Sequence, residues 1–151
     1  MKSLRMNAAL KYGEVKHKAV LADIVKRFAN ELQKIEFIDG KIAIILENPV
    51  EKHEFKHAIK AGGGIIEYGI NREMLIISPL ALFELVISVS ENREQDLKKI
   101  VQAQIKSKEK QAAIFNSTLT LRQKINKIGE EINDKAGLAN LLLLGAKLLL
   151  V

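Results

Sequence analysis

The C-terminal part of the chain begins with LALFELVISV at residues 80–89 and ends with GLANLLLLGAKLLLV at residues 137–151. Residues 80–151 contain no proline and only three glycines, Gly129, Gly137 and Gly145. Proline and glycine disfavour the interior of a helix more strongly than any other residues do. We therefore expect this stretch to be helical over nearly its whole length, and the rest of the fold to be organised around it.

Apolar residues after residue 90 recur mostly at three- and four-residue spacings, which is typical of a helical hairpin or a coiled coil. The pattern changes phase near Asn-Ser-Thr at residues 116–118, where a turn between two helices is expected because these residues compete with helical hydrogen bonds. The residues predicted to contact a second copy or a partner protein are Leu97, Val101, Ile105, Phe115, Leu119, Ile125, Ile128, Ile132, Leu141, Leu144 and Leu148.

The last segment, residues 137–151, places leucine on every side of the predicted helix and contains one lysine and one asparagine. A helix that is apolar all round is rarely left in water, so this segment must be covered. Burial within its own domain is favoured, and a subunit interface is the next alternative. Membrane insertion is not expected, because a bilayer-spanning helix needs about 20 apolar residues.

The N-terminal part is predicted to contain an amphipathic helix from Glu14 to Ile35, because its apolar residues recur every three or four positions. Residues 1–34 hold eight lysines and arginines against three acidic residues. Basic side chains on one helix face can contact phosphates, although a solvated surface is the favoured explanation because exposed lysine-rich faces are common. The predicted nucleic-acid contacts are Lys16, Lys18, Lys26 and Arg27.

The middle of the chain contains two predicted β-hairpins. Asp39-Gly40 separates the β-prone runs 35–38 and 41–46, and a second hairpin is expected to join residues 65–70 to residues 74–78. Residues 50–61 between them are predicted to form a short helix. These elements predict an α+β fold with a small, mostly antiparallel sheet of about four strands. We expect an α+β domain at residues 1–90 and a helical extension at residues 91–151, which packs on that domain or on a partner subunit.

Composition narrows the possible classes of function. The 151 residues include no cysteine and no tryptophan, and the formal net charge is +6. The absence of cysteine removes disulfides, thiolate metal sites and cysteine nucleophiles. The sparse aromatic residues leave little surface on which nucleic-acid bases could stack. No long apolar run typical of a secretion signal occurs near residue 1, and the expected location is cytoplasmic.

Residues 53–57 read His-Glu-Phe-Lys-His, which has the form HExxH and lies on the predicted helix at 50–61. Histidines four positions apart share one helix face and can bind Zn²⁺, while the glutamate between them can act as a base toward metal-bound water. In this motif the segment resembles the zincin metallopeptidases. The resemblance implies that His53 and His57 are zinc ligands and that Glu54 is the general base. The alternative interpretation is an exposed helix face.

The patterns together favour a non-catalytic interaction or structural protein that associates through its C-terminal helices, as a homo-oligomer or with a partner protein. Nonspecific nucleic-acid binding through the basic N-terminal helix is the first alternative. A zinc-dependent hydrolase that uses His53, Glu54 and His57 is the second. No cofactor is expected apart from the zinc of that second alternative.

Overall fold

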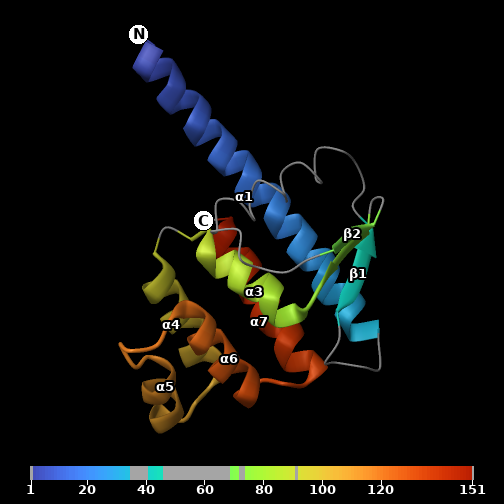
Figure 1. Cartoon of the computed structure of the whole chain (residues 1–151), viewed down its shortest axis with the longest axis vertical. Helices are drawn as coiled ribbons and strands as arrows, with labels where there is room; N and C mark the ends of the chain where they lie inside the picture. Colours follow the sequence, from blue (N-terminus) through green and yellow to red (C-terminus); the bar gives the residue numbers. More distant parts are fainter. Residues whose placement is uncertain (1, 35–40, 46–68, 72–73, 91, 151) are drawn as a thin grey trace.

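Helices make up most of the structure, as Figure 1 shows. The computed structural model describes residues 2–34, 41–45, 69–71, 74–90 and 92–150. Within these ranges the helices are α1 (Lys2–Lys34), α3 (Pro79–Ser88), α4 (Arg93–Gln104), α5 (Lys108–Ile114), α6 (Leu121–Glu131) and α7 (Lys135–Leu149). The strands found there are short: β1 (Ile42–Ile45), β2 (Gly69–Asn71) and β3 (Met74–Ile77).

The predicted α+β fold with a sheet of about four strands is wrong. The described residues are mostly helical, and they contain no four-stranded sheet. The three short strands pair antiparallel in the order β1-β3-β2, and Ile42 of β1 lies opposite Ile77 of β3. Residues 35–38, which were predicted to pair with the β1 strand, lie outside the described residues, as does the predicted helix at 50–61.

The buried core lies mainly between helices, and this is why the fold is mostly helical and not built on a four-stranded sheet. The most extensive contact joins α1 to α7, and α7 also packs along α3. Phe28 of α1, Phe83 of α3 and Leu142 of α7 are completely buried in this core. Ile42 of β1 and Ile77 of β3 join this buried apolar cluster from the sheet. The β-prone runs after residue 40 were expected to form strands of a sheet of about four strands, whereas the buried core lies mainly between the helices.

The amphipathic pattern predicted for the N-terminal helix is confirmed. Its apolar positions form one buried stripe along α1, namely Leu21, Ile24, Val25, Phe28 and Leu32. α1 is 33 residues long, which corresponds to about 50 Å at 1.5 Å per residue. Figure 1 shows its N-terminal half extending away from the other helices. The remaining half is the part that α7 and the sheet cover.

The C-terminal region is divided into shorter helices than the sequence predicted. The expected helix that contains Leu97 and Phe115 is interrupted after Gln104, and α5 begins anew after Ser107. The predicted turn at residues 116–118 is confirmed, since these residues lie between α5 and α6. Side chains cap the new helix starts: the Ser107 side chain accepts a hydrogen bond from the Lys110 N–H, and Thr120 and Gln123 form a capping box.

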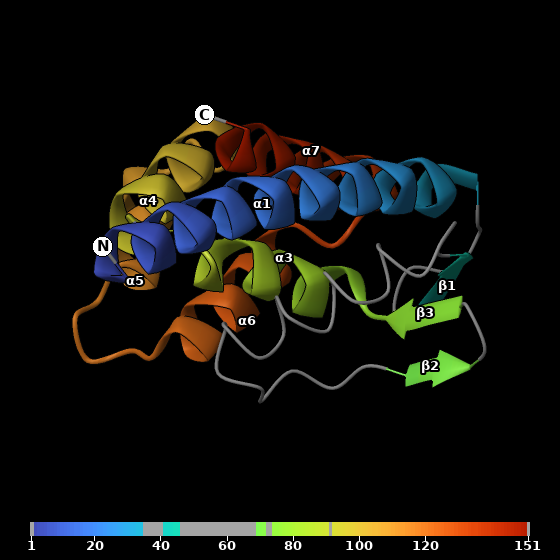
Figure 2. The same cartoon turned by 90° about the horizontal axis from the view of Figure 1, so that it is seen from above.

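Close packing brings the C-terminal helix into the body of the protein. α7 contacts α1, α3 and α4, and Figure 2 shows it running alongside α1. Its many leucines are therefore largely covered by the same chain. The division into a domain at residues 1–90 and an extension at residues 91–151 stays a prediction. Among the described helices, none is both long enough and apolar enough to cross a membrane.

Candidate functional site

The structure places most of the predicted interface residues in the interior. Leu97, Val101, Ile105, Ile125, Ile128, Ile132 and Leu141 are buried among the helices of the same chain. Phe115, Leu119, Leu144 and Leu148 are half-buried. Packing within the chain accounts for the apolar character of the first group, and a contact with a partner stays a prediction. The apolar surface left for contact with a partner protein is therefore smaller than the sequence pattern indicated.

The predicted phosphate-binding residues lie along α1 in different surroundings. Lys26 is exposed, whereas Lys18 is half-buried at the edge of a cavity. The Arg27 Nε atom lies 3.4 Å from the Asp23 carboxylate, one turn earlier on the same helix. Lys16 also belongs to α1, but its side chain is outside the described residues. A phosphate that binds Arg27 would have to compete with the Asp23 carboxylate of the same helix.

The HExxH motif is not described by the structure, because His53, Glu54 and His57 all lie within residues 46–68. Among the described residues, no group of three histidine, aspartate or glutamate side chains is arranged to hold a metal ion. The zinc-dependent alternative therefore stays a prediction from the sequence. Elemental analysis of the purified protein tests it, and loss of bound zinc in a His53→Ala variant is the result that the alternative requires.

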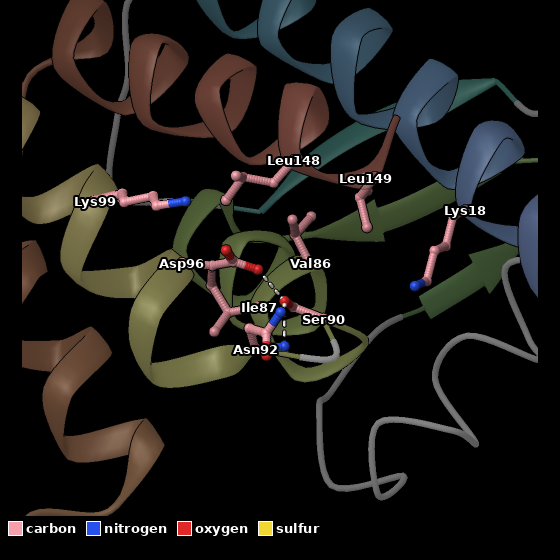
Figure 3. Close-up of a pocket in the computed structure, with 9 residues that line it drawn as sticks. All are labelled: Lys18, Val86, Ile87, Ser90, Asn92, Asp96, Lys99, Leu148 and Leu149. Atoms are coloured by element: carbon pink, nitrogen blue, oxygen red, sulfur yellow. Dashed lines mark hydrogen bonds between the residues drawn. The ribbon is translucent and has the colours of Figure 1, made fainter. Parts of the chain in front are cut away.

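A cavity of about 260 Å³ lies where α1, α3, α4 and α7 meet. Figure 3 shows that its lining combines apolar side chains with charged and polar ones. The lining residues are Lys18, Val86, Ile87, Ser90, Asn92, Asp96, Lys99, Leu148 and Leu149. Sequence analysis missed this cavity because its residues come from four separate helices and the α3–α4 connection. Only the packing of α7 against α3 and α4 brings them together.

The polar side of the cavity is organised by Ser90, which follows α3. Its hydroxyl donates a short hydrogen bond to Oδ2 of Asp96 and accepts one from the backbone N–H of Asn92 at 3.2 Å. These two contacts hold the Asp96 carboxylate over the start of α4, as Figure 3 shows. Among the described lining residues, no histidine accompanies this serine–aspartate pair, so the described part of the cavity does not contain the nucleophile and base of a serine hydrolase. The Ser90 hydrogen bonds orient the Asp96 carboxylate at the edge of the cavity.

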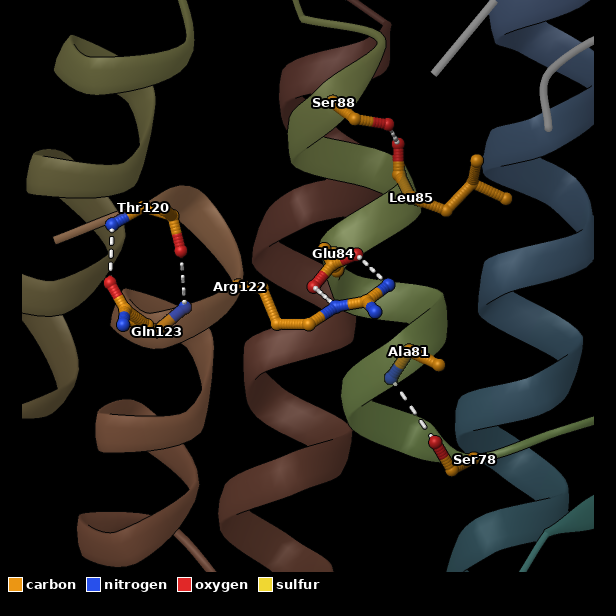
Figure 4. A network of polar contacts seen from close by, with 8 residues as sticks. All are labelled: Ser78, Ala81, Glu84, Leu85, Ser88, Thr120, Arg122 and Gln123. Atoms are coloured by element: carbon orange, nitrogen blue, oxygen red, sulfur yellow. Dashed lines mark hydrogen bonds and ion pairs between the residues drawn. The ribbon is translucent and has the colours of Figure 1, made fainter. Parts of the chain in front are cut away.

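A second polar cluster joins α3 to α6 (Figure 4). The carboxylate of Glu84 is 6% exposed, and Arg122 binds it with two hydrogen bonds, Nε to Oε1 at 3.2 Å and Nη2 to Oε2 at 3.1 Å. Parallel hydrogen bonds of this kind are among the stronger charged contacts. Arg122 itself is half exposed, and the pair is not part of the cavity. We interpret it as the contact that orients α6 on α3.

Two further ion pairs link the C-terminal helices. Lys110 of α5 lies 2.7 Å from the Glu131 carboxylate of α6, and this hydrogen bond and charge raise the pKa of Lys110 above its ordinary value. The buried Lys124 lies 3.7 Å from Glu94 of α4. The first pair joins the consecutive helices α5 and α6, and the second joins α4 to α6. Their arrangement points to packing of the helices and not to a catalytic acid or base.

Comparison with known proteins does not assign the chain to a family. No family model matches it, and no significant similarity to a curated protein or a solved structure was found. Function must therefore be inferred from the exposed surfaces and the cavity of this chain.

Proposed function

We propose that this protein is a non-catalytic interaction protein that associates with a second copy through its C-terminal helices. The observation that supports the proposal is the outward side of α7. Leu150, directly after α7, is 53% exposed and is the large apolar side chain left most open in the described part of the chain. Leu143 lies seven residues, or about two helical turns, earlier and is half-buried.

The contact proposed here is narrower than a full helix face. Asn140 and Lys147 lie on the same side of α7 and are exposed, so Leu143 and Leu150 are separated by polar groups. Burying what remains exposed of one leucine contributes about 1 kcal/mol. A stable interface usually buries at least about 1,000 Å² in total. Association through this surface is therefore expected to be weak and strongly dependent on protein concentration.

Half-buried apolar side chains also occur at the end of α5, apart from the surface on α7. Phe115 and Leu119 lie on the connection from α5 to α6, and neither is completely covered by the rest of the chain. The ammonium group of Lys98 lies 5.8 Å from the centre of the Phe115 ring. A partner that covers this ring would also remove the cation from water. Phe115 is therefore a less favourable contact point than Leu150.

Sedimentation equilibrium over a range of concentrations tests the proposal. The average mass should rise above the monomer mass of 16.9 kDa as the concentration increases. Leu150→Glu should abolish this rise, because association would desolvate the added carboxylate. Gln33→Glu, which adds the same charge at an exposed position of α1, is the matched control and should leave the rise unchanged. A monomer at every concentration would overturn the proposal.

Nucleic-acid binding through α1 is the second candidate function. It is favoured by the length of α1, by its extension beyond the other helices in Figure 1 and by the exposure of Lys26. Lys26→Gln should weaken binding to a DNA duplex in an electrophoretic shift, and rising salt should weaken it further. Lys41→Gln removes an exposed charge outside α1 and is the control. No shift even at low salt would exclude this candidate.

A further inference from the structure

The cavity where α1, α3, α4 and α7 meet carries an inference that is independent of self-association. We propose that this cavity binds a small organic anion with a short apolar chain, such as a medium-chain carboxylate. The cavity offers two kinds of surface to such a molecule. Its inner wall is apolar, and its edge carries lysine side chains from two different helices.

The apolar wall comes from α3 and α7. Val86 and Ile87 belong to the buried core, and Leu148 and Leu149 belong to the last turn of α7. A volume of about 260 Å³ lies just below the range of about 300–1,000 Å³ found for pockets that hold drug-sized ligands. A chain of several methylenes is therefore a more suitable occupant than a nucleotide or a peptide. Such a chain would gain contact mainly with Leu148, which is half-buried, because Val86 and Ile87 are already closed to water.

Charge at the edge favours a negative head group. Figure 3 shows Lys99 of α4 and Lys18 of α1 on opposite sides, with Asp96 and Ser90 between them. Among the described lining residues, two ammonium groups therefore face one carboxylate across the cavity. The Ser90 hydroxyl is already used as a donor to Asp96, so the proposed contacts to an anion come from the lysines. Asp96 would repel a ligand carboxylate that approached its own side of the cavity.

The ends of two helices carry partial negative charge at the cavity, so the lysines determine whether the cavity favours an anion or a cation. α3 and α7 both end near the cavity, and the C-terminus of a helix carries a partial negative charge. α4 begins there and offsets part of it. Without the lysines, the carbonyl ends and Asp96 would leave a site that prefers a cation. Lys18 already takes part in an interaction within the chain, so Lys99 is the residue whose replacement tests the sign of the preference.

Titration calorimetry with octanoate, octylammonium and octanol tests the proposal on the full chain. Octanoate should bind with a stoichiometry near one, octanol more weakly, and octylammonium not measurably. Across butanoate, hexanoate and octanoate, affinity should rise roughly fourfold for each added methylene while the chain still contacts the apolar wall. Backbone amide signals of residues near the cavity should shift during the same titration followed by nuclear magnetic resonance.

Two lysine variants of α4 provide a matched pair. Lys99→Met keeps most of the apolar stem and removes the charge, so it should weaken octanoate binding roughly threefold to fivefold. Lys98→Met is the control, because Lys98 lies over the Phe115 ring and does not line the cavity. Octanoate affinity should be unchanged in that variant.

Three results would overturn the proposal. The first is no binding of octanoate at any soluble concentration. The second is equal binding of octylammonium and octanoate, which would mean that the lysines do not determine the preference. The third is an equal loss of affinity in Lys98→Met and Lys99→Met, which would indicate a general effect of net charge and not a contact at the cavity.

Discussion

Gly145 of α7 packs against Val86 and Phe83 of α3, and Gly145→Ala tests this contact. A methyl group added at Gly145 would lie 2.9 Å from Cγ1 of Val86 and 3.7 Å from two ring atoms of Phe83. The first distance is too short for two carbon atoms in contact. Val86 is 1% exposed and branched at Cβ, so its methyl group has little freedom to rotate away. The helices must therefore move apart to accept the alanine.

Two opposing effects determine the size of the change. Alanine is favoured over glycine in a helix interior by about 1 kcal/mol. An additional methyl group in a closely packed core usually costs about 1–3 kcal/mol. We expect the cost to exceed the gain, so that Gly145→Ala lowers the free energy of unfolding by about 1 kcal/mol. For a chain of this size, the melting temperature should fall by about 2–4 °C.

Urea denaturation followed by circular dichroism at the helix signal measures this change. Gly129→Ala in α6 is the matched control. Its added methyl group would meet the end of the Leu80 side chain, which is half-buried and can rotate away. The same substitution should therefore leave stability unchanged or raise it slightly at Gly129. Opposite responses at the two glycines would distinguish packing from helix propensity.

A double-mutant cycle identifies the contact itself. Val86→Ala removes the methyl group that Gly145→Ala would meet, so the double variant should be more stable than the sum of the single effects predicts, by about 1 kcal/mol. Additive effects would refute the argument. An increase in stability of about 1 kcal/mol in Gly145→Ala alone would refute it as well, because helix propensity would then be the whole effect.

The remaining predictions concern polar contacts of the C-terminal helices. Arg122→Met should lower the free energy of unfolding by about 1–2 kcal/mol, measured by thermal denaturation, because the buried Glu84 carboxylate loses both hydrogen bonds. The double variant Arg122→Met with Glu84→Gln should recover part of this loss, because it removes the unpaired charge. Since the Glu131 hydrogen bond raises the pKa of Lys110 above 10.5, the stabilisation by this pair should be constant from neutral pH up to that value and should disappear as the pH rises further, measured as the difference in urea midpoint from Lys110→Met. Thr120→Ala should cost about 1 kcal/mol, because the N-terminal capping box of α6 is lost, and the same urea experiment measures it.

Some elements of the fold could be predicted because the responsible interactions are local. The three- and four-residue spacing from Leu21 to Leu32 correctly identified the buried side of α1, since helix geometry relates residues only a turn apart. The turn at residues 116–118 was predictable for a similar reason, because Asn and Ser side chains compete with the nearby backbone. The side chain of Asn116 accepts a hydrogen bond from the Thr118 N–H at 3.1 Å.

Other expectations failed because the spacing of apolar residues shows which face of a helix is buried but not which element covers it. Leu97 and Ile128 have the spacing of a seam between two chains, but both are buried by other helices of their own chain. The β-prone run that includes Ile42 was expected to belong to a sheet of about four strands, whereas the described sheet has three short strands beside a helical core. An apolar side chain gains the same free energy from either kind of covering surface.

The sequence by itself determined that residues 80–151 are mainly helical and that the leucines of the last segment must be covered, because both properties follow from local composition and spacing. Only the tertiary structure decided what covers them: α7 packs against α1 and α3, which lie far from it in the sequence. The same packing created the cavity that places Lys18 near Lys99. Burial of apolar surface is non-directional, so it requires contact without specifying which helices meet, and the close approach at Gly145 helps to select this one.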